Sequence, residues 1–332
     1  MVEQTSVLVR PAMPADLAAI SALLLQDAAD RAVSDGALWV PATDAAQRVA
    51  RAFADEVQDG RTGRWLVAEA AGAVVGVVRL GVTPCPPIYH LAGGLALVLF
   101  DETCVSRSAP DGAFAALIDA CEREGAAMGA VIQLAACASF QIEKRRALEA
   151  AGYGVVTEYL VKHGLADGTA SQSSVRVASS ADIPAIVAMG GEAQKALYQA
   201  NAEMWKPHPD APARFGVWMQ YSLTLADRRV LVFGAGEPCG FVIAQPVSAF
   251  HLPLTCARDH IGLIDDFWAS AFAALEASAL SDASALLAAA EAEFVRRGRT
   301  SAMAICPAVW HAKQDILRAH GYGDGNTWML KT

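Results

Sequence analysis

The sequence lacks the features of several large protein classes. Its seven cysteines form no C-x-x-C pair. An odd number of scattered cysteines is typical of buried thiols in a reducing compartment, rather than of a disulfide framework or a zinc site. We therefore predict no bound metal. Basic residues are also few, since 26 Lys and Arg stand against 35 Asp and Glu and give a net charge of −9. This balance disfavours a nucleic acid partner.

Long apolar runs are absent as well. The longest, Leu91–Phe100, is far shorter than the roughly 20 residues of a membrane span. The N-terminal Met1–Gln4 has neither the basic region nor the apolar core of a signal peptide. We therefore predict a cytoplasmic protein with no membrane partner. Hydrophobic residues make up 54% of the chain and charged residues 18%, which predicts large packed cores rather than disorder.

The sequence contains one pattern that occurs twice. Residues 137–162, shifted by 169 positions, align with residues 306–331 without a gap, and similar matches continue upstream at shifts of 166 and 164. A shift that drifts while the order is kept is expected of a duplicated domain whose loops have changed. We predict two domains, residues 1–165 and 172–332, each of ordinary domain size. The identical pairs in the last segment are Cys137/Cys306, Lys144/Lys313, Leu148/Leu317, Ala150/Ala319, Gly152/Gly321, Tyr153/Tyr322, Gly154/Gly323 and Lys162/Lys331.

Both copies predict the same order of elements. A short strand, a helix and a stretch expected to be irregular or helical (about 30–60 and 190–228) precede two hairpin strands with a glycine turn. A long strand follows (Leu95–Val105 and Ile261–Ala269), then an amphipathic helix, a strand, a short helix ended by glycine, and a last strand. This order predicts an α/β (α+β) fold. Each half would be a mixed, mostly antiparallel sheet flanked by helices, with one crossover helix after its fourth strand.

Several short runs carry a resemblance to a known family. They are the opening Val9–Leu17, the hairpin Val67–Gly76, and the closing helices with Gly152-Tyr153 and Gly321-Tyr322. Together with the order of elements, they resemble the GCN5-related N-acetyltransferase (GNAT) superfamily in a tandem two-domain form. The resemblance covers both halves, and its specificity lies in order, spacing and repetition. It implies the acyl-CoA N-acyltransferase fold.

The resemblance also implies a function. The chain would be an acetyl-CoA-dependent N-acetyltransferase, an acyltransferase that acts on the amine of a small molecule, with one half active. Two other functions stay open, because both halves depart from the family pattern: a non-catalytic acyl-CoA-binding or sensing protein, and a purely structural protein. A homodimer of the whole chain also stays open.

The same resemblance implies where acetyl-CoA would bind. In the family, backbone N–H groups at the start of the helix after the fourth strand bind the pyrophosphate, within a Q/R-x-x-G-x-G/A signature that neither half keeps. Phe114 would crowd the phosphates in the first half, so the second half is favoured. The predicted cofactor-binding residues are Val105, Gly112 and Ala113 in the first half and Trp268, Ala269, Ser281, Asp282 and Ala283 in the second.

Catalysis requires a base, because an ammonium group has no lone pair until it loses a proton. In the family an acid on the fourth strand often accepts that proton, and the resemblance transfers this role to Glu102 or Asp266, with Asp265 as neighbour. The alternative is that these are merely polar strand residues. The family's proton-donating tyrosine is replaced by leucine in both halves (Leu148 and Leu317), and His311 is a nearby substitute.

The repeated lysines, Lys144 and Lys313, lie on the predicted short helices. We expect them to be solvated charges on the helix surface, as is common for charged helix faces. Contact with the nucleotide phosphates of acetyl-CoA is the alternative.

Overall fold

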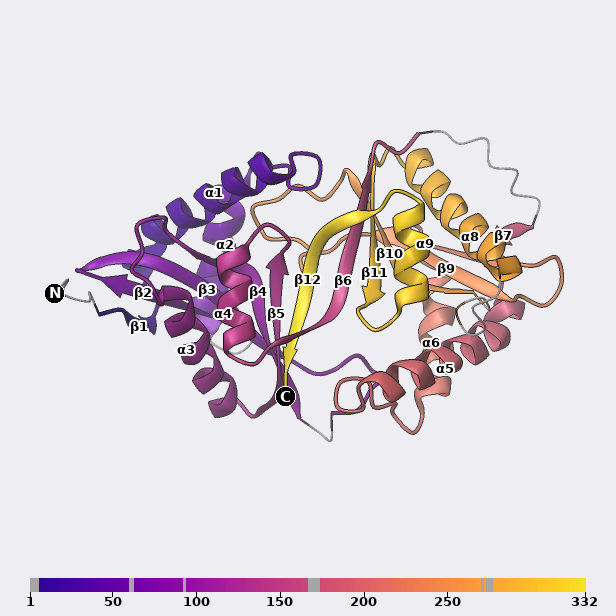
Figure 1. Cartoon of the computed structure of the whole chain (residues 1–332), viewed down its shortest axis with the longest axis horizontal. Helices are drawn as coiled ribbons and strands as arrows, with labels where there is room; N and C mark the ends of the chain where they lie inside the picture. Colours follow the sequence, from indigo (N-terminus) through magenta and orange to yellow (C-terminus); the bar gives the residue numbers. More distant parts are fainter. Residues whose placement is uncertain (1–5, 60–62, 92–93, 167–173, 270–271, 273–276) are drawn as a thin grey trace.

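The computed structural model describes the chain except for residues 1–5, 60–62, 92–93, 167–173, 270–271 and 273–276. The elements of the two halves follow one another in the same order (Figure 1). The first half contains β1 (Leu8–Pro11), a 3-10 turn (Pro14–Asp16), α1 (Leu17–Ser34), α2 (Ala45–Asp59), β2 (Gly63–Ala70), β3 (Ala73–Thr83), β4 (Leu95–Val105), α3 (Ala113–Ala127), β5 (Ala130–Ala138), α4 (Ile142–Ala150) and β6 (Gly154–His163). The second half contains β7 (Val175–Val177), a 3-10 turn (Ser180–Asp182), α5 (Ile183–Ala200), α6 (Ala211–Ser222), β8 (Arg229–Phe233), β9 (Gly240–Pro246), β10 (Ile261–Ala269), α8 (Ala277–Arg296), β11 (Ser301–Pro307), α9 (His311–Ala319) and β12 (Gly323–Lys331).

The strands form one continuous mixed sheet. Their order is β1-β2-β3-β4-β5-β12-β6-β11-β10-β9-β8-β7. If each strand is replaced by its counterpart in the other half and the order is reversed, the same order results, so the sheet has an internal pseudo-two-fold relation centred between β12 and β6. Only the pairs β4–β5 and β10–β11 are parallel among the described ladders. The duplication and the mostly antiparallel fold class predicted from the sequence are thereby confirmed.

The last strand of each half lies in the sheet of the other half. β12 pairs with β5 of the first half, and β6 pairs with β11 of the second half. The two exchanged strands also pair with each other at the centre of the sheet (Figure 1). Each half therefore completes its sheet with a strand that its own sequence does not supply.

The helices before the exchanged strands end at glycines, as predicted. Gly152 follows α4 with φ 92°, and Gly321 follows α9 with φ 86°. These are left-handed conformations that glycine adopts without a steric penalty. The repeated glycine therefore turns each chain from its short helix into the exchanged strand.

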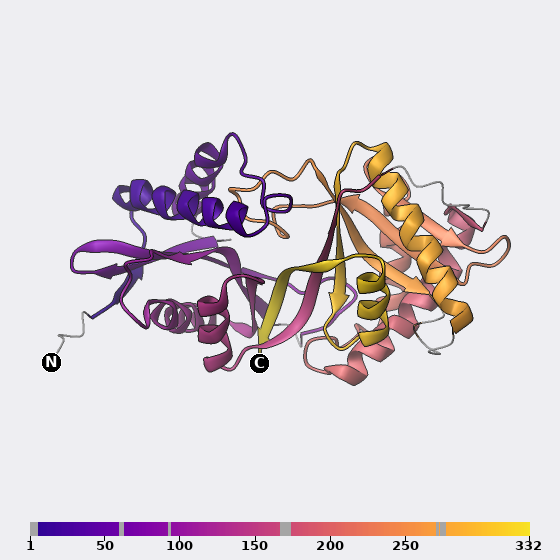
Figure 2. The same ribbon diagram turned by 45° about the horizontal axis from the view of Figure 1, so that its top comes forward.

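Helices cover both faces of the sheet. In the first half, α1 and α2 lie on one face and α3 and α4 on the other (Figure 2). Alternate residues of β2 divide between the layers: Leu66 and Ala68 belong to the core under α3, whereas Trp65 and Val67 belong to the core under α1 and α2. This division follows from the two-residue period of a strand.

The stretches about 30–60 and 190–228, expected to be irregular or helical, are largely helical. They contain α2, α6 and the ends of α1 and α5. Buried residues recur at every fourth position of α2 and α6, which places them on one helix face. Tryptophan and proline residues before each helix obscured this period. The buried residues are Ala45, Val49 and Phe53 in α2 and Ala211, Phe215 and Met219 in α6.

Reciprocal backbone contacts join the two halves outside the sheet. The α1–α2 connection of the first half forms an isolated bridge between Pro41 and Cys256, and the α5–α6 connection of the second half forms one between Pro207 and Tyr89. A loop of each half therefore contacts a loop of the other half.

Candidate functional site

In each half, two parallel strands start as neighbours and then part. β4 pairs with β5 from Leu95 to Leu99, and β10 pairs with β11 from Ile261 to Ile264; the described residues beyond these points are not paired with each other. At the same points β4 and β10 carry bulges, where their register with β3 and β9 shifts. A bulge bends its strand, which accounts for the separation of the two strands. We call the separation of β4 from β5 after Leu99 the first parting, and that of β10 from β11 after Ile264 the second parting. Both acidic pairs predicted from the sequence lie at these bulges.

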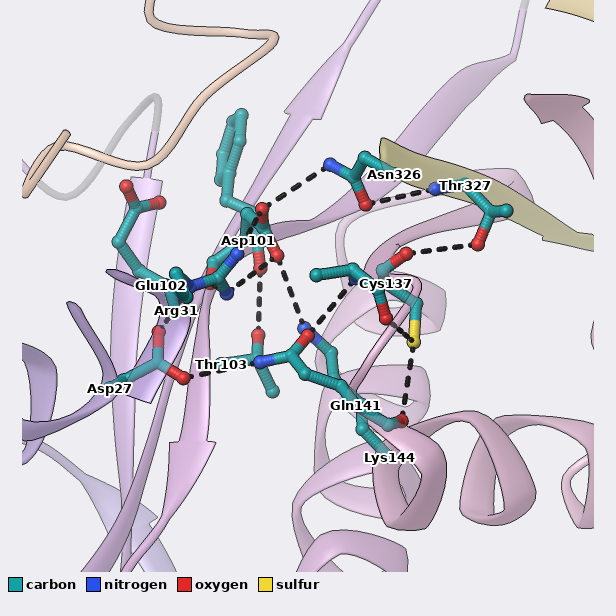
Figure 3. Close-up of polar contacts among 12 residues, drawn as sticks. Asp27, Arg31, Asp101, Glu102, Thr103, Cys137, Gln141, Lys144, Asn326 and Thr327 are labelled. Carbon is teal, nitrogen blue, oxygen red and sulfur yellow. Dashed lines mark hydrogen bonds and ion pairs between the residues drawn. The ribbon is translucent and has the colours of Figure 1, made fainter. Parts of the chain in front are cut away.

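The acid at the first parting, Asp101, is buried in a polar network (Figure 3). Two guanidinium nitrogens of Arg31, a fully buried residue of α1, each lie 3.0 Å from a carboxylate oxygen of Asp101. The Nε of Arg31 lies 2.6 Å from Asp27. Lys144 of α4 places its Nζ 3.6 Å from Asp101, and Asn326 of β12 donates a 3.3 Å hydrogen bond to it. The first parting is therefore closed by side chains from both halves.

Glu102, the predicted base of the first half, is also buried and engaged. Arg79 places Nη1 3.3 Å from Glu102, and its Nε lies 3.0 Å from Glu56. The backbone N–H of Leu254 donates a 2.6 Å hydrogen bond to the other carboxylate oxygen of Glu102. Burial raises the pKa of Glu102, while Arg79 and this N–H oppose the rise. Both oxygens of Glu102 are thus occupied by structural partners.

The repeated lysines are buried, so both earlier interpretations of them are wrong. Lys144 is 2% exposed and Lys313 is 3% exposed. They face the partings of the sheet instead of solvent or nucleotide phosphates, because α4 and α9 pack with these residues inward. A buried ammonium group requires a counter-charge. Lys144 has Asp101 at 3.6 Å, and the charge of Lys313 opposes the rise in the pKa of Asp266. The repeated lysine therefore brings a buried positive charge near the acids of each half and, among the described residues, forms an ion pair with Asp101 alone.

The acids at the second parting have a different environment. Asp265 and Asp266 are half-buried, and neither takes part in an ion pair within the described part of the chain. Leu197 occupies the position that corresponds to Arg31, so the second copy lacks the arginine that binds the acid in the first. One oxygen of Asp266 accepts a 2.8 Å hydrogen bond from the backbone N–H of Phe267.

Burial raises the pKa of both acids at the second parting. For Asp265, burial acts first and the charge of Asp266 second; together they raise its pKa to about 6 against the effects of Arg228, Lys313 and a hydrogen bond from Gln245. Burial also raises the pKa of Asp266, and Lys313 opposes the rise. This pair therefore includes a carboxylate that is ionised at neutral pH and is a stronger base than an ordinary aspartate.

Asp101 shows the opposite shift. Burial alone would raise its pKa, but the charges of Arg31 and Lys144 outweigh burial and lower it. A carboxylate held in this way is a weak base, because protonation would break its ion pairs. The two partings thus differ in the availability of their acids.

Two tyrosines of the first half border the second acidic pair, and the sequence did not predict this. Tyr89, in the β3–β4 connection, contacts the ring of Trp205 at 5.1 Å between centroids. Burial and then the charge of Asp266 raise the pKa of Tyr89. Burial and then the charge of Asp265 raise the pKa of Tyr159, a residue of β6. Because both come from the other half of the chain, local patterns around β10 gave no signal for them.

The predicted cofactor residues of the first half lie where the sequence placed them. Val105 ends β4, Gly112 precedes α3 with φ 85°, and Ala113 is the first residue of that helix. Glycine adopts this left-handed conformation without strain, and the helix start presents N–H groups without intrahelical partners. The parting that leads toward them is the one closed by Asp101 and Arg31.

In the second half, the predicted helix start is wrong. Trp268 and Ala269 are buried at the end of β10, but α8 already extends from Ala277. Ser281, Asp282 and Ala283 therefore lie beyond its first turn. Backbone N–H groups beyond the first four of a helix bond within the helix, so these three residues cannot offer free N–H groups to a phosphate. Residues 270–271 and 273–276, which precede the helix, lie outside the described residues.

His311 does not join the acidic pair. It is exposed at the start of α9, and its Nδ1 lies 3.3 Å from the side-chain oxygen of Gln314. The preceding Trp310 packs instead near the second parting, 5.4 Å from Trp268 and 6.1 Å from Phe272 between ring centroids. Aromatic rings therefore border the second parting, whereas charged side chains close the first parting.

All seven cysteines are free thiols, and five of them are buried, in agreement with the sequence prediction. Within the described ranges, no three His, Cys, Asp or Glu side chains gather so that they could hold a metal ion. No helix in that part of the chain combines the length and the apolar character required to cross a membrane.

Comparison with solved structures defines the fold. A GCN5-related N-acetyltransferase from Sphaerobacter thermophilus is similar with a TM-score of 0.62 at 16% identity, over 98% of this chain and 95% of that one. A tandem GNAT protein from the clavulanic acid biosynthesis pathway, solved without acetyl-CoA, gives a TM-score of 0.54 at 13% identity, over 98% of both chains. A GCN5-related glucosamine N-acetyltransferase region of a fungal multi-domain β-N-acetylglucosaminidase gives 0.54 at 14% identity, over 99% of this chain and 38% of that one. No family model and no curated protein matches the sequence. At these identities the likeness is one of fold, and it confirms the predicted tandem GNAT fold.

Proposed function

We propose that this chain, with its tandem GNAT fold, is an N-acetyltransferase that transfers an acetyl group from acetyl-CoA to the amine of a small molecule, and that the second half carries the reaction. One observation supports this choice above all. Among the described residues, the half-buried Asp265 and Asp266 form no ion pair at the parting of β10 and β11, whereas Asp101 at the equivalent parting is bound by Arg31. Only the second half therefore offers an available base beside parted strands.

The second parting suits an extended, amide-containing ligand. From Phe267 to Ala269, β10 keeps its pairing with β9 but has no strand partner among the described residues on the side of β11. Backbone N–H and C=O groups on that edge can pair with the amides of a pantetheine arm, much as an added strand pairs with a sheet edge. Trp268 and Trp310 would border the arm. Acetyl-CoA, when bound, supplies the acetyl group as an activated thioester.

The task of the protein's own residues is to hold the acceptor amine and remove its proton. Asp265, with a pKa of about 6, is mostly ionised at neutral pH and binds a proton more tightly than an ordinary aspartate does. Asp266 raises that pKa through its own charge, so the two acids titrate as a coupled pair. We assign the role of base to the pair.

Substitutions in the two acidic pairs test this assignment. In Asp265→Asn and Asp266→Asn we expect kcat/KM for acetyl transfer to fall by about 10²- to 10⁴-fold, because an amide cannot accept the proton. Thiol release from acetyl-CoA, measured with a panel of small primary amines, gives the rate. The matched control is Glu102→Gln in the first half, which keeps the size of the side chain and should leave the rate within a few-fold of the original. Full activity in the Asp265→Asn/Asp266→Asn double variant, with loss only in Glu102→Gln, would place the reaction in the first half.

Binding of acetyl-CoA distinguishes this function from its alternatives. Calorimetry that detects binding, together with no thiol release on any amine, would support an acyl-CoA-binding or sensing protein. The aromatic cluster of Trp268, Phe272 and Trp310 could serve such a protein equally well. Absence of binding to the whole chain would support a structural role.

A further inference from the structure

Arg228 lies beside the second acidic pair, fixed in place but without a carboxylate partner. Its Nη1 donates a 2.7 Å hydrogen bond to the hydroxyl of Ser222, and its guanidinium lies 4.7 Å from the centre of the Trp218 ring. Its Nε is shielded from water and has no hydrogen-bond partner among the described residues. None of the ion pairs of the described chain includes it. Because sheltered charges in proteins are normally paired, this arginine requires another explanation.

The next residue, Arg229, shows the ordinary arrangement. Its Nε lies 3.4 Å from Glu293 of α8. In the first half, the register of β2 on β3 makes Arg64 the counterpart of Arg229, and Arg64 pairs in the same way with Glu124 of α3. The counterpart of Arg228 is a glycine, Gly63. The duplicated architecture therefore accounts for Arg229 and does not account for Arg228.

Arg228 directly precedes β8 and is near enough to Asp265 for its charge to oppose the rise in the pKa of that acid. Its guanidinium contacts Trp218 of α6, whereas Arg229 reaches Glu293 of α8, so the two neighbouring side chains point in different directions. The following residue, Arg229, pairs with Ala244 on β9; the next residue of β9, Gln245, pairs with Leu263 on β10, two residues before Asp265. Gln245 also opposes the rise in the pKa of Asp265, and its own side-chain oxygen is buried without a partner among the described residues. The equivalent positions of Arg228 and Gln245 in the first half are Gly63 and Gly81, neither of which carries a polar side chain.

From this arrangement we propose that the acceptor carries a carboxylate next to its amine, as an α-amino acid does. Arg228 binds the carboxylate, and the Asp265–Asp266 pair receives the ammonium group. Opposite charges side by side, each incompletely satisfied, are complementary to a zwitterion. The guanidinium fork suits a carboxylate, and the free oxygen of Gln245 accepts a hydrogen bond from the ammonium group. This inference rests on the proposed function and names the class of its acceptor.

Matched pairs of acceptors test the role of Arg228. Each pair consists of an amino acid and the amine left when its carboxylate is removed: phenylalanine and phenethylamine, lysine and cadaverine. We expect the chain to prefer the amino acid of a pair by about 10²-fold in kcat/KM. Arg228→Met should abolish this preference, and Arg228→Lys, which keeps the charge but loses the fork, should retain part of it. Arg229→Met is the matched control and should keep the preference. Equal use of both members by the unmodified chain, or a preference that survives Arg228→Met, would overturn the inference.

A binding measurement separates this inference from the proposed function. Calorimetric titration of the whole chain with phenylalanine and with lysine requires no turnover. Binding that is lost in Arg228→Met and kept in Arg229→Met supports the inference even if no acceptor is acetylated, in which case only the proposed function fails. Acetylation of the simple amines, without binding that depends on Arg228, leaves the function standing and overturns the inference. Circular dichroism melts of both variants verify that they are folded.

Discussion

The two partings of the sheet are built from copies of one segment, yet side chains close them differently. At the first, the fully buried Arg31 reaches Asp101 at 3.0 Å and Lys144 adds a second cation. At the second, Leu197 stands in the place of Arg31, and the acidic pair forms no ion pair among the described residues, although the charges of Lys313 and Arg228 act on it. The replacement of this buried arginine by leucine on the helix over the parting thus contributes to the difference between an acid that is an ion-pair partner and acids that are available as a base. Because the two halves are copies of one segment, each serves as the reference against which the other is compared.

The most direct test of this difference is to replace Arg31 of the first copy by leucine, the residue that the second copy has at the same position. In Arg31→Leu, Asp101 keeps a lysine and an asparagine but loses both of its short contacts with the guanidinium. Removing one partner of a buried ion pair costs about 3–5 kcal/mol, because the remaining charge stays buried. We expect a loss of that size in the free energy of unfolding, measured by urea titration at pH 7.

The matched control is Leu197→Met, a change of similar volume that should cost less than about 1.5 kcal/mol. The Arg31→Leu/Asp101→Leu double variant should recover most of the loss, since replacing a whole buried pair by apolar residues is often neutral. A loss below about 1 kcal/mol in Arg31→Leu would mean that the network does not hold the first parting closed.

The pH dependence of stability should have opposite signs for the two acids. The pKa of Asp101 is lowered in the folded protein, so its contribution is present above the pKa of the unfolded chain and is lost as pH falls. The pKa of Asp265 is raised to about 6. Its folded environment therefore favours the protonated form, and stability is lost as pH rises from about 4 through 6.

We therefore expect Asp265→Asn to be more stable than the unmodified chain at pH 7.5, by up to about 3 kcal/mol, with the difference vanishing near pH 4. Asp101→Asn should be less stable at neutral pH, and its deficit should shrink as pH falls. Urea unfolding at several pH values measures both series. Parallel pH trends in the two variants would contradict the assignment of one paired and one unpaired acid.

The sequence predicts the fold well where the signal is local or repeated. The bounds of β4 and β10 agree with the structure, because long apolar runs with acidic interruptions are visible in one dimension. The glycine-ended helices are also recovered from the repeat. In contrast, the exchange of β6 and β12 has no local signal, since either strand could equally have stayed in its own half.

In the candidate site, too, the sequence predicts the features that have a local signal and misses those that depend on distant residues. The positions of the acidic pairs are visible in the sequence, but their different states depend on Arg31, which lies 70 residues before Asp101. The burial of the repeated lysines was misjudged, because charge on a short helix usually indicates solvent exposure. Tyr89 and Tyr159 reach the second parting only through contacts between the halves. Distant partners, rather than local composition, determine what each acid can do.

Features that the two halves still share should respond alike, and the arginines of the loop contacts test this. Arg48 Nη1 donates to the carbonyl of Cys256 at 3.1 Å, and its counterpart Arg214 Nη1 donates to the carbonyl of Pro87 at 3.0 Å. Each ties a helix of one half to a loop of the other. We expect Arg48→Met and Arg214→Met each to lower the free energy of unfolding by about 1 kcal/mol, the usual net value of such a hydrogen bond.

Arg48 also pairs with Asp44 four residues earlier, but this exposed pair adds at most about 0.5 kcal/mol. Because the two contacts are separate, the double variant should lose the sum of the single losses within about 0.5 kcal/mol. Thermal and urea unfolding of the three variants measure these effects. If one single variant lost several times more than the other, the loop contacts would have diverged as the partings have. Equal small losses would confine the divergence of the two copies to the acids and the side chains around them.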